Sequence, residues 1–102
     1  MIVRVLTAKV SYASSGRMHE LMRQQLPVLH EQDGLVYVKL ARRLLGPIEE
    51  VVLFEEWRDS ASMYAWTGPD LTRPRLLPGT ESLIEDLVIT HYEALDIEPS
   101  VD

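Results

Sequence analysis

The chain has 102 residues, of which 46% are hydrophobic and 25% are charged, and its formal net charge at pH 7 is −6. This length predicts one domain, and the composition is typical of a soluble globular protein and not of a disordered one. The negative charge disfavours nucleic acid as a partner, because neutralising phosphates needs a basic surface. No apolar run approaches the ~20 residues of a membrane-spanning helix, so we expect no membrane partner.

Cysteine is absent, which excludes disulfides, thiolate metal ligands and a cysteine nucleophile. The start, Met1-Ile2-Val3-Arg4, lacks the charged region that precedes the apolar core of a signal peptide. Together these features predict a cytoplasmic protein. All ten Lys and Arg lie at or before Arg75, and only acids follow among the charged residues. This asymmetry predicts a solvated acidic tail at about residues 96–102, at the end of a single domain that spans residues 1–102.

The alternation over residues 2–10 predicts a β-strand, and both of its sides are largely apolar. We therefore expect a central strand that is covered on both faces. Residues 14–16 offer a helix start, and the helix that follows has one apolar and one charged face. Pro27 inside this helix should kink it or begin a new turn. His19 and His30 of the same helix are expected to be solvated.

Residues 33–58 predict two strands joined by a tight turn. Asp33-Gly34 ends the helix, and an alternating strand follows at residues 36–40. Leu45-Gly46-Pro47-Ile48 has the composition of a hairpin turn, and a third strand is expected at residues 50–58.

A short helix is expected at residues 60–66, with the side chain of Asp59 or Ser60 as its cap. Residues 67–79 hold three prolines and two glycines. They predict an ordered loop of the length that often forms a lid or a binding loop. A last strand at residues 87–95 completes the order βαββαβ, which is the ferredoxin-like α+β fold with an antiparallel sheet.

One face of this sheet would be covered by the two helices. The opposite face would carry Phe54 and, from the first strand, Leu6. We expect that face to be too apolar to stay in water. Packing against a second copy in a symmetric homodimer is the simplest way to cover it.

The segment Glu55-x-Trp57-Arg58-Asp59 joins the third strand to the second helix. Three further features accompany this segment: Leu26-Pro27, Asp33-Gly34, and Trp66, which stands nine residues after Trp57. Together they resemble the antibiotic biosynthesis monooxygenase family of dimeric α+β barrels. The resemblance covers nearly the whole chain. It implies one pocket per subunit between the sheet and the helices, a small-molecule substrate, and no bound metal or flavin cofactor.

The resemblance also implies which side chains line this pocket. The strand residues that would face it are Thr7, Leu53, Glu55 and Trp57. The last three share one parity along their strand and are therefore consistent with each other. Trp66 would look in from the second helix, and residues 67–79 would close the mouth.

By the same resemblance, the chain would be a cofactor-independent monooxygenase of a small aromatic or quinol-like substrate. Glu55 would accept a proton from an electron-rich phenol, because burial would make its carboxylate a stronger base. The resulting anion would reduce O2, and the products would collapse to a hydroperoxide and then to a quinone. Trp66 and Tyr37 would position the ring, and Arg75 could reach an anionic substrate from the loop.

Each of these residues also has a structural interpretation. Glu55 can be a buried carboxylate that pairs with an arginine or a backbone amide, and Trp57 can belong to the core. Tyr37 can simply pack on the sheet, and Arg75 can be a solvated loop residue.

The function has alternatives as well. One is a non-catalytic dimeric module that binds a small molecule or regulates a partner, and a pocket filled by Trp57, Trp66 and Leu53 would favour it. Another is an isomerase or cyclase of the same barrel type, which would use a base but not oxygen.

The more specific activities of the family have less support in these residues. The haem-degrading branch has Asn, Trp and His where this chain has Thr7, Trp66 and Leu76, so we expect no haem degradation. The polar amide that the polyketide oxygenases carry near Leu53 is missing too. His91 in the last strand has no Asp, Glu or second His at metal-ligand spacing, which predicts a structural histidine and no metal site.

Overall fold

The computed structural model describes residues 1–95 and residue 97, so the acidic tail expected at residues 96–102 lies outside the described residues, apart from Ile97. The element order βαββαβ and the ferredoxin-like α+β class are confirmed. Single turns of 3-10 helix lie at Tyr12–Ser14 and Glu81–Leu83. The strands and α-helices are β1 (Ile2–Ser11), α1 (Ser15–His30), β2 (Leu35–Leu45), β3 (Ile48–Trp57), α2 (Ser60–Thr67) and β4 (Ile84–Glu93).

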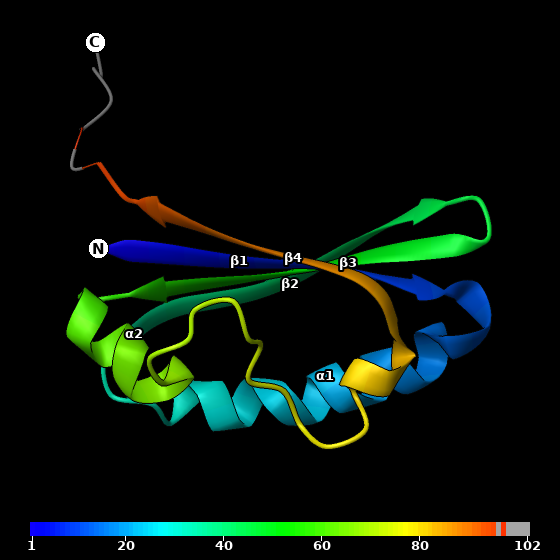
Figure 1. Ribbon diagram of the computed structural model, residues 1–102, viewed down its shortest axis with the longest axis horizontal. Helices are drawn as coiled ribbons and strands as arrows, with labels where there is room; N and C mark the ends of the chain where they lie inside the picture. The colour runs from blue at the N-terminus through cyan, green and yellow to red at the C-terminus, as the bar shows by residue number, and fades with distance from the viewer. Residues whose placement is uncertain (96, 98–102) are drawn as a thin grey trace, which may run out of the picture.

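The four strands form one antiparallel sheet in the order β2-β3-β1-β4. In Figure 1 both helices and the loop between α2 and β4 lie on the same side of this sheet. The β2–β3 hairpin turns at Gly46, as predicted, and its far end extends beyond the helices (Figure 1). We call the side under the helices the covered face and the opposite side the open face.

Strand β1 is central, but it is covered on one face and not on both. Its buried residues alternate along the strand and point to the covered face, while the residues between them are partly exposed on the open face. Leu6 pairs directly with Leu53 and is buried with it, so the expectation that Leu6 lies on the open face is wrong. The reason is that directly opposed residues of antiparallel strands share a face, and β3 decides which parity of β1 is covered.

Helix α1 is amphipathic, as its sequence predicts, and it runs through Pro27 to His30. Its buried side chains face the sheet and are apolar except for Gln25. No helix within the described part of the chain is long and apolar enough to cross a membrane.

The hydrophobic core lies between the covered face and the helices. One cluster surrounds the two tryptophans and consists of Leu6, Leu29, Leu53, Trp57, Met63 and Trp66. A second cluster lies toward the other end of the sheet and consists of Ala8, Val10, Met18, Met22 and Val51. The core therefore fills the layer in which a ligand pocket was expected.

The junction between β3 and α2 follows directly from its sequence. The side chain of Asp59 caps α2 by accepting a hydrogen bond from the amide of Ser62 (2.8 Å). The amide of Arg58 donates to the carbonyl of Gly34 (2.7 Å), which ties the start of β2 to this junction. Gly34 has a φ of +86°, and a Cβ there would overlap the side chain of Ser62. Only glycine therefore fits without strain.

We expect Gly34→Ala to lower the free energy of unfolding by about 2–4 kcal/mol, from the left-handed backbone and the overlap with Ser62 combined. Gly46→Ala is the matched control, because Gly46 also has a positive φ (+63°) but nothing lies within 4 Å of its Cβ position. The control should lose only the backbone part, about 1–2 kcal/mol. Urea denaturation followed by circular dichroism measures both values, and equal losses would contradict the close approach.

Candidate functional site

Five of the side chains expected at the pocket come together on the covered face. Leu53, Glu55 and Trp57 alternate along β3, and each is at most 3% exposed. Trp66 of α2 is buried against the same cluster. The guanidinium of Arg75 lies 4.3 Å from the centre of the Trp66 ring and also donates a hydrogen bond to the Trp66 carbonyl (2.5 Å). Arg75 thus packs on the tryptophan from the loop, at a distance that suits a cation–π contact.

Thr7 and Tyr37 do not join them. Thr7 pairs with Val52, one residue out of phase with Leu53, and so faces the open side of the sheet. Tyr37 pairs with Glu56, is 49% exposed and also belongs to the open face. The expectation that Thr7 faces the pocket with Glu55 is therefore wrong, because a shift of one residue along a strand moves a side chain to the other face. Of the two interpretations of Tyr37, its position favours packing on the sheet over contact with a ligand under the helices.

Glu55 is a buried carboxyl group with two partners. Its Oε1 accepts a hydrogen bond from the Trp57 indole N–H (3.1 Å) and lies 3.9 Å from Nε of Arg4. Burial raises the pKa of Glu55, and the Trp57 hydrogen bond and the positive charge of Arg4 oppose this rise. The group is therefore paired with an arginine and is also a stronger base than an exposed glutamate.

Arg4 links Glu55 to His91. Arg4 is almost fully buried, and burial lowers the pKa of its guanidinium while the charge of Glu55 raises it. Its Nη1 lies 2.8 Å from Nε2 of His91. An arginine has no acceptor, so Nε2 must accept, which makes His91 neutral with its proton on Nδ1. Burial and the charge of Arg4 lower the pKa of His91 in agreement with this state.

The loop between α2 and β4, residues 68–80, is fastened over this cluster by two buried side chains, Arg4 of β1 and Gln25 of α1. Residues 67–79 were expected to form such a closing loop. Their attachment through long-range hydrogen bonds was not visible in the sequence. The four bonds are Arg4 Nη1 to Leu71 O (3.2 Å), Arg4 Nη2 to Arg73 O (2.8 Å), Gln25 Nε2 to Arg75 O (3.2 Å) and Leu77 N to Gln25 Oε1 (3.0 Å).

Little space is left under this loop. The cavity between the sheet, α1 and the loop has a volume of about 10 Å³. This is about the space of one water molecule, whereas ligand pockets usually hold ~300–1,000 Å³. The side chains around it are apolar: Leu6, Ala8, Met18, Met22, Val51, Leu53, Leu76, Ile84 and Leu87. A ligand could enter here only if the loop moved.

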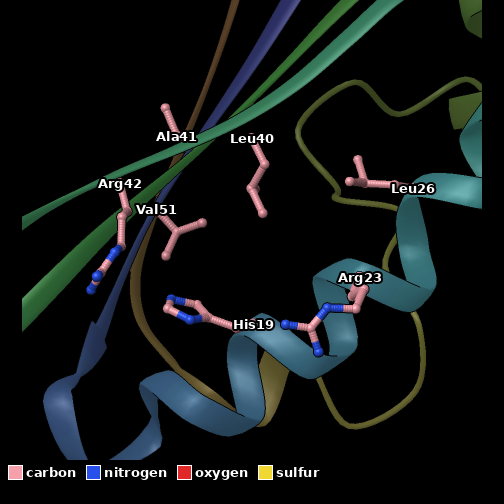
Figure 2. A pocket seen from close by; sticks show the side chains of 7 residues that line it. All are labelled: His19, Arg23, Leu26, Leu40, Ala41, Arg42 and Val51. Carbon is pink, nitrogen blue, oxygen red and sulfur yellow. The ribbon is translucent and has the colours of Figure 1, made fainter.

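A larger hollow of about 300 Å³ lies between α1 and β2 (Figure 2). Its lining comprises His19, Arg23, Leu26, Leu40, Ala41, Arg42 and Val51. His19 was expected to be solvated, but it is partly buried, and its Nε2 lies 2.6 Å from Oε1 of the fully buried Glu49. The sequence indicates the pair of His19 and Glu49 only through Glu49, an acidic residue at a position of β3 that the alternating pattern places on the covered face.

Two polar clusters thus lie on the covered face, one formed by Arg4, Glu55 and His91 and one by His19 and Glu49. The sequence did not single out Arg4 or Glu49 as members of a site. Both are charged residues within otherwise alternating apolar strands, and that placement was the available signal. Within residues 1–95 and 97, no group of three or more His, Cys, Asp or Glu side chains is arranged to hold a metal ion. The polar groups in both clusters are arginine, histidine and carboxylate, a set suited to binding anions and moving protons.

The sequence matches no family model and no curated protein, but the fold has relatives among solved structures. A protein from Deinococcus radiodurans, provisionally assigned as an antibiotic biosynthesis monooxygenase, superposes with a TM-score of 0.77 over 100% of both chains at 20% identity. A structure named antibiotic biosynthesis monooxygenase gives 0.74 over 93% of this chain and 99% of that one, at 18% identity. The haem degrader MhuD of Mycobacterium tuberculosis, solved with two haems in its active site, gives 0.68 over 96% and 100%, at 16% identity.

Sequence identities this low do not show that this chain has the activity of those proteins. The structural superposition, however, covers nearly the complete chain. The expected resemblance therefore holds for the fold. The chain has the fold of the antibiotic biosynthesis monooxygenase structures.

The raised pKa of Glu55 predicts a specific pH dependence of stability. Between the ordinary value of 4.5 and the raised value, the folded chain holds a proton that the unfolded chain releases. Stability due to this group therefore falls as the pH rises through that window. We subtract the free energy of unfolding of Glu55→Gln from that of the wild type at each pH. We expect this difference to fall as the pH rises from 4.5 to the raised pKa of Glu55 and to stay constant at higher pH.

Glu50→Gln is the control on the same strand. A hydrogen bond from Arg43 holds the pKa of Glu50 below its ordinary value, so its contribution to stability is lost as the pH falls. The corresponding difference should rise with pH, opposite to that of Glu55. Urea unfolding at a series of pH values measures both slopes, and a flat difference for Glu55 would show that its proton affinity does not change on folding.

Proposed function

We propose that this chain is an enzyme of the monooxygenase type that oxidises a small aromatic or quinol-like substrate with O2 and needs no metal or flavin. The observation that carries the proposal is the buried Glu55, held between Trp57 and Arg4 beneath a fastened loop. The names of the structures that share the fold support oxidation of small molecules as the general class. The lack of cysteine suits a reducing compartment, so we assign the reaction to the cytoplasm.

In this proposal Glu55 accepts the hydroxyl proton of a phenol, since a buried carboxylate with a raised pKa is the stronger base. The phenolate gives one electron to O2, and the two radicals combine to a peroxide at the ring carbon opposite the hydroxyl. Loss of water from this peroxide leaves a quinone. One phenol and one O2 thus give one quinone and one water, so the substrate itself supplies all the electrons.

The surrounding residues have roles that follow from their positions. Arg4 carries a positive charge close to Glu55 and would stabilise the anion as it forms in a site from which water is excluded. Leu53 and Trp57 provide an apolar surface for the ring, and the Trp66–Arg75 stack forms a wall on the loop side. Because the cavity measures only about 10 Å³, residues 68–80 would have to lift for the substrate to enter.

We further propose that the active form is a homodimer that packs through the open face. This face carries large exposed apolar side chains, among them Tyr37, Phe54, Val88 and Tyr92. Apolar patches of this kind on a sheet usually mark an interface. Thr7 and Tyr37 would then contribute to the contact between subunits and not to the pocket of their own subunit.

A non-catalytic dimeric module that binds a small molecule is the second candidate. The filled interior favours it, because Leu53, Trp57 and Trp66 are all nearly fully buried and leave almost no cavity. In that case Glu55 and Arg4 would serve only to hold the loop in place.

Oxygen consumption with a panel of anthrones, quinols and naphthols tests the catalytic proposal. We expect O2 uptake with at least one of them, and we expect Glu55→Gln to lower kcat/KM by about 100-fold or more, as loss of a general base does. Glutamine can still accept the Trp57 hydrogen bond, so the fold should persist. Glu50→Gln, on the same strand but on the open face, should keep the wild-type rate.

The possible results separate the candidates. Turnover of a substrate without O2 uptake would indicate an isomerase or cyclase. Saturable binding without turnover would indicate the non-catalytic module. Equal rates for Glu55→Gln and wild type would remove Glu55 from the mechanism.

Native mass spectrometry tests the dimer. We expect the wild type to show twice the mass of one chain, and a bound small molecule would add its mass to each subunit. Phe54→Lys, which places a charge on the open face, should yield mainly monomer with an unchanged circular dichroism spectrum. A wild type that is monomeric at micromolar concentration would contradict the proposed interface.

A further inference from the structure

We infer that the hollow between α1 and β2 is a second ligand site, one that takes a small weak organic acid with an apolar body and holds it as its anion. The hollow measures about 300 Å³, at the lower end of the range for ligand pockets, and it exceeds the cavity under the loop about thirtyfold. It shares neither Glu55 nor the loop, so the inference is independent of the proposed function.

The walls of the hollow are apolar in the interior and cationic at the rim. Leu40 extends from β2 toward α1, and Leu26 approaches from the helix side (Figure 2). Arg23 comes from the helix wall and Arg42 from the strand wall, so guanidinium groups stand on both sides. An apolar body with one anionic end fits this distribution.

Both arginines have donors left for a ligand. Arg23 pairs with Glu20, but both side chains are largely exposed, and such surface pairs are weak and easily exchanged. Arg42 is half exposed and lies 3.6 Å from Oε1 of Glu49, an oxygen that it shares with His19. Since a guanidinium carries five N–H donors, neither arginine is saturated by these contacts.

His19 supplies a proton acceptor at the same place. Its Nε2 lies 2.6 Å from Oε1 of Glu49 and donates to that carboxylate, so in the neutral form of the ring the lone pair is on Nδ1. Glu49 is fully buried, and its Oε2 has no hydrogen-bond partner within the described part of the chain. A buried carboxylate with an unsatisfied oxygen is destabilising, and such groups are more common where a function requires them.

The chemical step is a proton transfer. The O–H bond of the ligand breaks and its proton moves to Nδ1 of His19, so that a neutral acid and a neutral imidazole become an oxyanion and an imidazolium. Nothing is oxidised or reduced. The imidazolium then lies between the carboxylate of Glu49 and the ligand anion, and Arg23 and Arg42 donate hydrogen bonds to that anion.

We choose 4-nitrophenol as the probe, because its phenolate absorbs visible light and its neutral form does not. The probe is titrated with the full chain at a pH at which most of the free probe is neutral. We expect a saturable rise in phenolate absorbance. The methyl ether 4-nitroanisole has the same body but no proton to give, and it should bind at least about tenfold more weakly, as expected when charged hydrogen bonds are lost.

Two neighbouring arginines provide a matched pair of variants. Arg42 faces the hollow, whereas Arg43 points to the open face and pairs with Glu50 (2.8 Å). Both substitutions to glutamine remove the same charge from the same strand. We expect Arg42→Gln to weaken binding by about tenfold or more and Arg43→Gln to leave it within about twofold. His19→Gln, which keeps an N–H for Glu49, should abolish the absorbance rise.

Three outcomes would overturn the inference. The first is no rise in phenolate absorbance at any protein concentration. The second is equal affinity for 4-nitrophenol and 4-nitroanisole, which would mean an apolar hollow only. The third is an equal loss of binding in Arg42→Gln and Arg43→Gln, which would mean general attraction of an anion to a charged strand.

Discussion

The buried guanidinium of Arg4 organises one end of this molecule. A charge taken out of water must be paired and hydrogen-bonded, and removing one member of a buried pair typically costs about 3–5 kcal/mol. Arg4 meets this requirement with a carboxylate on β3, a neutral histidine on β4 and two carbonyls of the loop before β4. The sheet register, the protonation state of His91 and the position of the loop are thus coupled through one side chain.

The chain places its two buried glutamates in contrasting surroundings. Glu55 lies beneath the fastened loop beside Trp57 and Arg4, and Glu49 lies behind a histidine that borders an open hollow of about 300 Å³. Both are on the covered face of β3, six residues apart, so they occupy the two ends of the core layer. Glu55 would meet a substrate only if the loop moved, whereas Glu49 is fully buried and is connected to the hollow through His19.

The two faces of the sheet differ in which side chains they bury and which they expose. The covered face holds Arg4, Glu49 and Glu55 among apolar neighbours, and the open face holds Phe54, Tyr37 and Tyr92 with only partial cover. Since alternate residues of one strand serve both faces, β3 carries Glu55 toward the core and Phe54 toward the open side. One strand therefore contributes to both a candidate site and a candidate interface.

Local patterns in the sequence determined the elements and their order. Alternation predicted the strands, Gly46-Pro47 the hairpin, and Asp59 or Ser60 the cap of α2, which is Asp59 in the structure. These signals act between residues that are near neighbours in the chain. The common face of Leu53, Glu55 and Trp57 followed from strand parity alone. Only the tertiary structure decided the rest. The face of Thr7 and Tyr37 depends on register, and the partners of Arg4 and His19 lie on distant segments. Such pairings arise when the chain folds, and no short-range pattern encodes them.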